Sequence, residues 1–250
     1  MLDIYYNLRV GRSEAQVARE VRALTRKRKV PGGRHMVQPR VVAGCEGAGY
    51  TKRALPDIPG YRLIRDRSNK SRANIWAYVW DRDTLSGIHW EQMHETWGRT
   101  DHPGEHEARA WLKFVRDGQL YLIGHQPPKY TDNTLPAQRE GIEYLVGEMA
   151  PWIKQDYSEQ QRAKLKARVV KMMADMNRGP RETGPGPKEL ATRVDGVIVG
   201  QTIDMMVGRL LEVLDVELIT EVRIDDKTVV PMLSDHDHAV AFWTRPKKLV

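Results

Sequence analysis

The chain has 250 residues, 40% hydrophobic and 29% charged, a composition typical of a folded globular protein. Forty Lys and Arg against 33 Asp and Glu give a net charge of +7, which favours a polyanionic partner because cationic side chains release counterions from phosphate backbones. A single cysteine excludes an intramolecular disulfide and favours an intracellular, cytoplasmic protein. We expect neither a signal peptide nor a membrane span, because the sequence has no basic leader before a long apolar run.

The N-terminal part alternates short strands with a helix. Residues 2–8 are apolar and aromatic, which predicts a strand. A helix follows, because Ser13 and Gln16 form a capping box and apolar residues then repeat at helical spacing. Residues 25–40 are basic and contain a Pro-Gly-Gly turn, so we expect a loop. The next strand is predicted at residues 41–46.

The middle of the chain predicts a run of strands and then a helix. The strands are expected at residues 61–65, 74–80, 112–115 and 120–124. An Asp-Gly turn between the last two indicates an antiparallel pair. Residues 89–106 are polar, with Trp and four histidines, and are expected to form a substrate-facing or solvated loop. A helix is predicted from Pro136 to about Trp152.

The C-terminal part continues the alternation without a break in composition. Short apolar runs predict strands at residues 169–173 and 194–199, separated by a Pro- and Gly-rich loop over residues 178–188. Two more strands are expected at residues 217–224 and 239–243. We therefore predict a single domain over residues 1–250, without internal repeats.

Polar residues follow the predicted strands, at the positions where α/β folds present reactive groups. They are Asn7, Glu46, His125, Asp175, Asn177, Asp235 and His236. Taken singly, each is more often a turn-forming amide or a solvated charge. Taken together, they supply oxygen ligands suited to Mg²⁺ and donors suited to phosphate.

Six segments carry a resemblance to a known family, and they follow one another in the family's order. They read YYNLRVG, VVAGCEGAGY, LIGHQPP, VVKMMADMN, RVDGVIV and LSDHDHAVAFW. Over residues 4–243 the chain thereby resembles the endonuclease/exonuclease/phosphatase superfamily. The resemblance implies a DNase I-like fold: a four-layer α/β sandwich of two packed mixed β-sheets flanked by helices. It also implies hydrolysis of a phosphoester with Mg²⁺, or Mn²⁺, as the cofactor.

The resemblance assigns the metal and the attacking water to five acidic and amide positions. Glu46 matches the metal-binding glutamate, with Asn7 beside it and Asp235 near the metal. Asp175 and Asn177 match the pair that positions or deprotonates the attacking water and holds the phosphate. Water then attacks in line with the leaving group, without a covalent intermediate.

The resemblance assigns further contacts to two histidines and to an aspartate that orients one of them. His236 would contact the scissile phosphate, and Asp195 would orient that histidine. His125 would donate to the phosphate or to the leaving oxygen. Arg109 and Arg139 are candidates for binding substrate phosphates.

Two residues that directly precede expected site residues depart from the family pattern. Cys45 precedes the glutamate where glutamine is common, and Ala174 precedes Asp175 where glycine is usual. We expect both departures to affect packing.

Two further clusters have alternative interpretations. The basic run of Arg26, Lys27 and Arg28 is either a solvated face or a contact to a nucleic-acid backbone, and we favour the second because it leads into the strand that ends at Glu46. The alternating segment 235–238 offers Asp and His ligands for zinc, to which further histidines could add. Those histidines are His89, His94, His102 and His106.

These observations predict a monomeric, Mg²⁺-dependent phosphodiesterase that acts as a nuclease on DNA or RNA. The alternative within enzymes is a phosphatase acting on a small phosphorylated molecule or a lipid headgroup. The alternative outside enzymes is a catalytically silent nucleic-acid-binding module of the same fold, which would not need so many charges at one place.

Overall fold

The structure is a computed structural model. The described residues are 1–7, 13–45, 55–65, 75–81, 90–98, 106–116, 119–125, 134–153, 169–176, 182, 184–200, 204–225, 227–232 and 239–247. Within these ranges, residues 90–98, 106–110, 125, 134–137 and 150–153 are described by their backbone.

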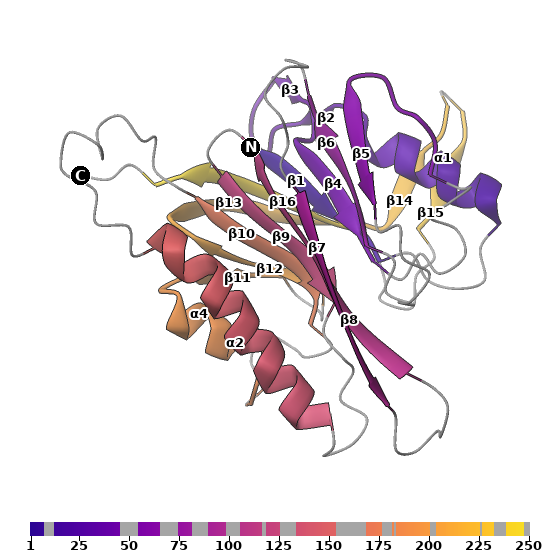
Figure 1. Cartoon of the computed structure of the whole chain (residues 1–250). Coiled ribbons are helices and arrows are strands. Elements are labelled where there is room, and N and C mark those ends of the chain that lie inside the picture. Colours follow the sequence, from indigo (N-terminus) through magenta and orange to yellow (C-terminus); the bar gives the residue numbers. More distant parts are fainter. Residues whose placement is uncertain are drawn as a thin grey trace.

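Two six-stranded mixed sheets form the centre of the molecule (Figure 1). Sheet 1 has the order β13 (Leu211–Ile219), β16 (Ala239–Pro246), β1 (Leu2–Tyr5), β4 (Val41–Gly44), β6 (Trp76–Trp80) and β5 (Tyr61–Arg65). Sheet 2 has the order β11 (Val197–Val199), β12 (Asp204–Arg209), β10 (Val170–Asp175), β9 (Gln119–His125), β8 (His106–Arg116) and β7 (Trp90–Gly98). Each sheet has one parallel pair at its centre, β1 with β4 and β10 with β9, and its other neighbours are antiparallel.

Helices cover the outer faces of both sheets, so the molecule has four layers (Figure 1). Helix α1 (Glu14–Leu24) packs on sheet 1, while α2 (Thr134–Ile153) and α4 (Pro187–Arg193) pack on sheet 2. The apolar side chains between the two sheets form a core of their own. The predicted α/β sandwich is thus confirmed.

Two short ribbons complete the fold. Strands β2 (Arg28–Lys29) and β3 (Met36–Val37) pair within the basic segment that was expected to be a loop. Strands β14 (Glu221–Arg223) and β15 (Val229–Pro231) pair beside α1. Among the described helices, none combines the length and apolar character needed to cross a membrane.

Helix α1 forms as its sequence predicts. The Ser13 hydroxyl accepts a hydrogen bond from the Gln16 amide at 3.2 Å, and the Gln16 side chain accepts one from the Ser13 amide at 2.9 Å. The apolar face of the helix is fully buried against sheet 1. The Tyr6 hydroxyl donates to Glu20 at 2.6 Å and fixes the helix to the end of β1.

The alternation of side chains along β1 places three polar residues in the space between the sheets. Asp3, Tyr5 and Asn7 are fully buried there, while the residues between them pack under α1. On β10, Lys171 and Asp175 face the same space. The centre of the sandwich therefore carries charge and hydrogen bonds as well as apolar contacts.

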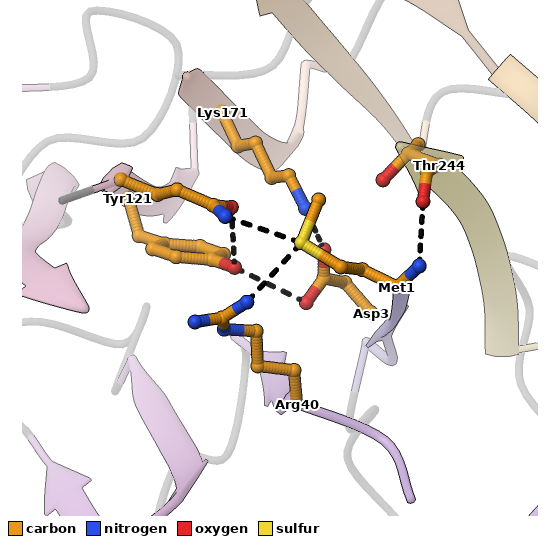
Figure 2. Close-up of polar contacts among 7 residues, drawn as sticks. Met1, Asp3, Arg40, Tyr121, Lys171 and Thr244 are labelled. Carbon is orange, nitrogen blue, oxygen red and sulfur yellow. Dashed lines mark hydrogen bonds and ion pairs between the residues drawn. The ribbon is translucent and has the colours of Figure 1, made fainter. Parts of the chain in front are cut away.

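A buried ion pair joins the two sheets at the beginning of β1 (Figure 2). The Lys171 ammonium donates to the Asp3 carboxylate, and both side chains are fully buried. The Lys171 nitrogen lies 5.3 Å from the centre of the Tyr121 ring, whose hydroxyl donates to Asp3 at 3.4 Å. Burial lowers the pKa of Lys171, and the negative charge of Asp3 partly offsets this shift.

The structure corrects the expected elements at several places. Residues 90–98, expected to be loop, form strand β7, because they pair along their whole length with β8. Residues 187–193 form α4 inside and beyond the expected Pro- and Gly-rich loop. Strand β12 was not expected, and the strand expected at residues 217–224 is two strands, β13 and β14, on either side of Thr220.

Candidate active site

The candidate site lies where β1, β4, β9 and β10 end and where β12 begins. Asp175 closes β10 and pairs with His125, the last residue of β9, because these two strands are parallel. On its other side Asp175 pairs with Asp204, the first residue of β12. Strand β4 leads from the same end, through Cys45, to Glu46.

Asn7 and Asp175 connect the two sheets at this end. The Asn7 Nδ2 group donates a hydrogen bond to Asp175 Oδ2 at 3.2 Å, and both side chains are fully buried. The oxygen of the same side-chain amide, Asn7 Oδ1, is buried and accepts no hydrogen bond from any residue that the structure describes. A buried acceptor without a donor is costly, so this oxygen is suited to a ligand outside the described set.

Tyr5 lies directly beneath this pair. Its hydroxyl accepts a hydrogen bond from the Asp175 backbone amide at 2.9 Å and donates one to the Gly124 carbonyl at 2.8 Å. Cys45 Sγ lies 3.1 Å from the same oxygen. The Trp111 ring packs against Gly124 so closely that a Cβ there would lie 2.1 Å from it, which explains the glycine before His125.

The hydroxyl of Tyr5 stays protonated. Burial raises its pKa well above the usual value, and the nearby Cys45, Asp204 and Asp175 raise the pKa further because they disfavour a second negative charge. The group can therefore donate to Gly124 at neutral pH.

Asp204 belongs to this cluster, although sequence reasoning missed it. Its side chain is fully buried, level with Asp175 and close enough to Tyr5 to affect the pKa of that hydroxyl. Its signal is modest: a carboxylate directly before the short apolar run of Met205, Met206 and Val207.

The structure places Asp195 away from the site, which corrects the expectation for that residue. Asp195 is exposed in the turn before β11, with a φ of 51°. Val197 pairs with Gly208, and Gly208 pairs with Lys171, so β11 begins at the end of sheet 2 opposite to Asp175. Among the residues that the structure describes, the fold therefore keeps Asp195 apart from Asn7 and Asp175.

The basic run also lies at the opposite end of the strands. The Thr25 carbonyl accepts hydrogen bonds from Gln38 and from the Tyr61 hydroxyl. The run therefore lies beside the beginning of β4 and not beside its end. Arg26 donates to the carbonyls of Arg223 and Ile224 at 3.1 and 2.7 Å, and Arg28 pairs with Glu217 at 3.4 Å. With Lys27 they line a pocket of about 350 Å³ beside β14. The basic run therefore lies away from Asn7 and Asp175, although it leads into β4 in the sequence.

The structure describes the other expected site residues to different extents. Glu46, Asn177, Asp235 and His236 lie outside the described residues. His125 is the last residue of β9 and Arg109 lies on β8, and both are described by their backbone. Arg139 is exposed on α2.

The described donors fit a hard divalent cation better than zinc. Asn7, Asp175 and Asp204 offer amide and carboxylate oxygens, which Mg²⁺ and Mn²⁺ prefer. Within the described residues, no group of three or more His, Cys, Asp or Glu is gathered for metal binding. The zinc alternative rests on residues 235–238, His89 and His102, which lie outside those residues, and on His94 and His106, which lie on β7 and β8.

Comparison with known proteins gives a consistent fold. No protein-family model and no curated protein matches the sequence. Among solved structures, an endonuclease/exonuclease/phosphatase family protein from Bacteroides thetaiotaomicron matches with a TM-score of 0.55 at 13% identity, over 97% of this chain and 93% of that one.

Two further solved structures match over nearly their whole lengths. TDP2 of D. rerio, complexed with a single-strand DNA product, has a TM-score of 0.52 at 10% identity, over 98% of both chains. CdtB, the biologically active subunit of cytolethal distending toxin, has a TM-score of 0.52 at 12% identity, over 99% of this chain and 97% of that one. The chain therefore has the DNase I-like fold of the endonuclease/exonuclease/phosphatase proteins.

Proposed function

We propose that the protein is a divalent-metal-dependent phosphodiesterase that hydrolyses nucleic acids by in-line attack of water. The observation that carries this proposal is the buried pair of Asn7 and Asp175 at the strand ends, with Asn7 Oδ1 left without a described donor. Such a pair does not stabilise an apolar core, because each buried polar group loses its hydrogen bonds to water and needs new partners to offset that cost.

Each residue has a proposed role. Asp175, held by Asn7, orients the attacking water and accepts its proton, with Asn177 two residues later binding a phosphate oxygen. Asn7 Oδ1, Glu46 and Asp235 would hold Mg²⁺ or Mn²⁺. When bound, the cation neutralises charge on the phosphate and the leaving oxygen.

The histidines complete the proposed site. His125 and His236 donate to the phosphate, and Asp204 takes the orienting role that the sequence assigned to Asp195, because Asp204 is the buried aspartate level with Asp175. Arg139, which is exposed on α2, would contact the substrate away from the strand ends.

A nucleic-acid substrate is supported by two observations. The net charge of +7 favours a polyanion. A protein of the same fold, TDP2, has been captured with a single-strand DNA product. We therefore place a nuclease ahead of a phosphatase for small phosphoesters.

The first test is cleavage of end-labelled single- and double-stranded DNA and RNA, with Mg²⁺ or with EDTA. We expect cleavage that requires Mg²⁺. Products from small phosphate monoesters alone would favour a phosphatase, and the absence of product from every substrate would favour a silent binding module.

The decisive variant is Asp175→Asn, with Asp195→Asn as its matched control. Asn at position 175 can still accept the Asn7 hydrogen bond but cannot take a proton, so we expect kcat to fall about a hundredfold or more. Asp195 is exposed with a positive φ that Asn tolerates, so the same change there should leave activity intact. Equal activity in both variants would contradict the proposal.

A further inference from the structure

The hydroxyl of Tyr5 contacts two strands of the other sheet and the residue that follows β4. From β1 in sheet 1 it reaches the Asp175 amide on β10, the Gly124 carbonyl on β9 and Cys45 Sγ after β4. The oxygen is fully buried in the core between the sheets. Both a donor and an acceptor function of the hydroxyl are used, so the contact has a defined geometry.

Every one of these contacts is adjacent in sequence to a residue of the candidate site. Asn7 is two residues beyond Tyr5, Glu46 follows Cys45, and His125 follows Gly124. Asp175 is itself the residue whose amide is bound. These four segments come from positions far apart in the chain and are joined at this one oxygen.

We propose that Tyr5 is a positioning residue of the active site, whose hydroxyl sets the spacing between the ends of β1, β4, β9 and β10. The inference rests on the proposed phosphodiesterase function and goes beyond it. A displacement of about 1 Å between reacting groups is enough to slow catalysis about a hundredfold. Contacts from one oxygen to segments of three other strand ends prevent such a displacement.

The hydroxyl, and not the ring, carries this role. The ring packs among apolar side chains of both sheets, a function that phenylalanine would serve equally well. Removing the oxygen leaves the Asp175 amide and the Gly124 carbonyl without this shared partner while it keeps the packing. Tyr5→Phe is therefore the informative change.

Tyr121 provides a matched control. It is a fully buried tyrosine of the same core, stacked on Phe114 with 5.0 Å between ring centres. Its hydroxyl lies at the other end of the strands, 3.4 Å from both Asp3 and Gln119. Tyr121→Phe removes the same atom from the same core without touching the candidate site.

The experiment compares wild type, Tyr5→Phe and Tyr121→Phe on end-labelled single-stranded DNA and RNA oligonucleotides with saturating Mg²⁺. Thermal unfolding first identifies a temperature at which all three are folded. We expect kcat to fall about tenfold or more in Tyr5→Phe, with KM nearly unchanged, and both constants to stay near wild type in Tyr121→Phe. Amide hydrogen exchange of Asp175 should accelerate in Tyr5→Phe alone.

The outcomes distinguish the positioning role of Tyr5 from the phosphodiesterase function. If the wild type cleaves and Tyr5→Phe keeps its kcat, the positioning role is overturned while the phosphodiesterase function stands. A loss of kcat shared equally by Tyr121→Phe also overturns it, because the effect is then one of general stability. A wild type inactive on DNA, RNA and bis(p-nitrophenyl) phosphate overturns the function and this inference with it.

Discussion

Asp204 is fully buried at the first position of β12, beside Asp175 and near the Tyr5 hydroxyl. Two buried carboxylates on neighbouring strands repel each other, and their desolvation lowers stability unless a cation or a donor compensates. This arrangement is expected of a site for chemistry and not of a structural core.

We predict that Asp204→Asn lowers kcat about tenfold or more while the protein stays folded. The amide keeps the shape of the side chain but removes the charge that orients a histidine or attracts the cation. Steady-state kinetics and thermal unfolding of the same preparations measure both effects. Full activity with reduced stability would show that Asp204 is structural.

At the residue scale the sequence predicts Asn7 and Asp175 because each follows a clear apolar strand. It cannot choose between Asp195 and Asp204, since each precedes a short apolar run. The choice depends on strand direction: β11 and β12 are antiparallel, so their leading residues lie at opposite ends of sheet 2. Pairing of this kind is not encoded in local spacing.

At the scale of elements, the Asp3–Lys171 pair connects β1 of one sheet to β10 of the other. Removing one member of a buried pair leaves the other charge uncompensated, at a cost of about 3 to 5 kcal/mol. We predict that Lys171→Met lowers the free energy of unfolding by about this amount.

Urea unfolding measures this loss, and a double-mutant cycle tests its cause. Asp3→Asn combined with Lys171→Met should be more stable than Lys171→Met alone, because the double variant leaves no unpaired carboxylate in the core. Additive losses in the cycle would show that the two side chains act independently.

Elements defined by local signals are the ones that the sequence predicts. Helix α1 follows from its capping box and apolar period, both contained in residues 13–24. Strand β7 was missed because its partner β8 is separated from it by residues 99–105 and its own composition is polar. Helix α4, with 7 residues, is too short to show a period and begins at Pro187 inside a Pro- and Gly-rich segment.

At the scale of the whole molecule, several buried tyrosines link stability to alkaline pH. Burial is the main cause that raises the pKa of Tyr5, Tyr61, Tyr78 and Tyr121 above the ordinary value. In the unfolded chain these hydroxyls ionise near about pH 10, while in the folded chain they stay protonated. The unfolded state therefore binds fewer protons above that pH, and stability falls as the pH rises.

We predict that the free energy of unfolding decreases above about pH 10, by up to about 1.4 kcal/mol per pH unit for each of these tyrosines. Below about pH 10.4 the lowered pKa of Lys171 makes the free energy of unfolding rise with pH, but this effect comes from a single group. Urea unfolding between about pH 8 and about pH 11 measures the slope, and tyrosinate absorbance should rise together with unfolding. Ionisation of all tyrosines in the folded protein would contradict this prediction.

Strands β1 and β10 are fastened to each other at two points, by Asp3 with Lys171 and by Asn7 with Asp175. Asn7 lies four positions after Asp3, a span of about 13 Å of extended chain. A framework anchored at both ends resists sliding of one sheet over the other. The segments that continue from its strand ends can then differ in length and composition without moving the anchors, which makes the fold suited to loop grafting, with new substrates recognised above an unchanged base.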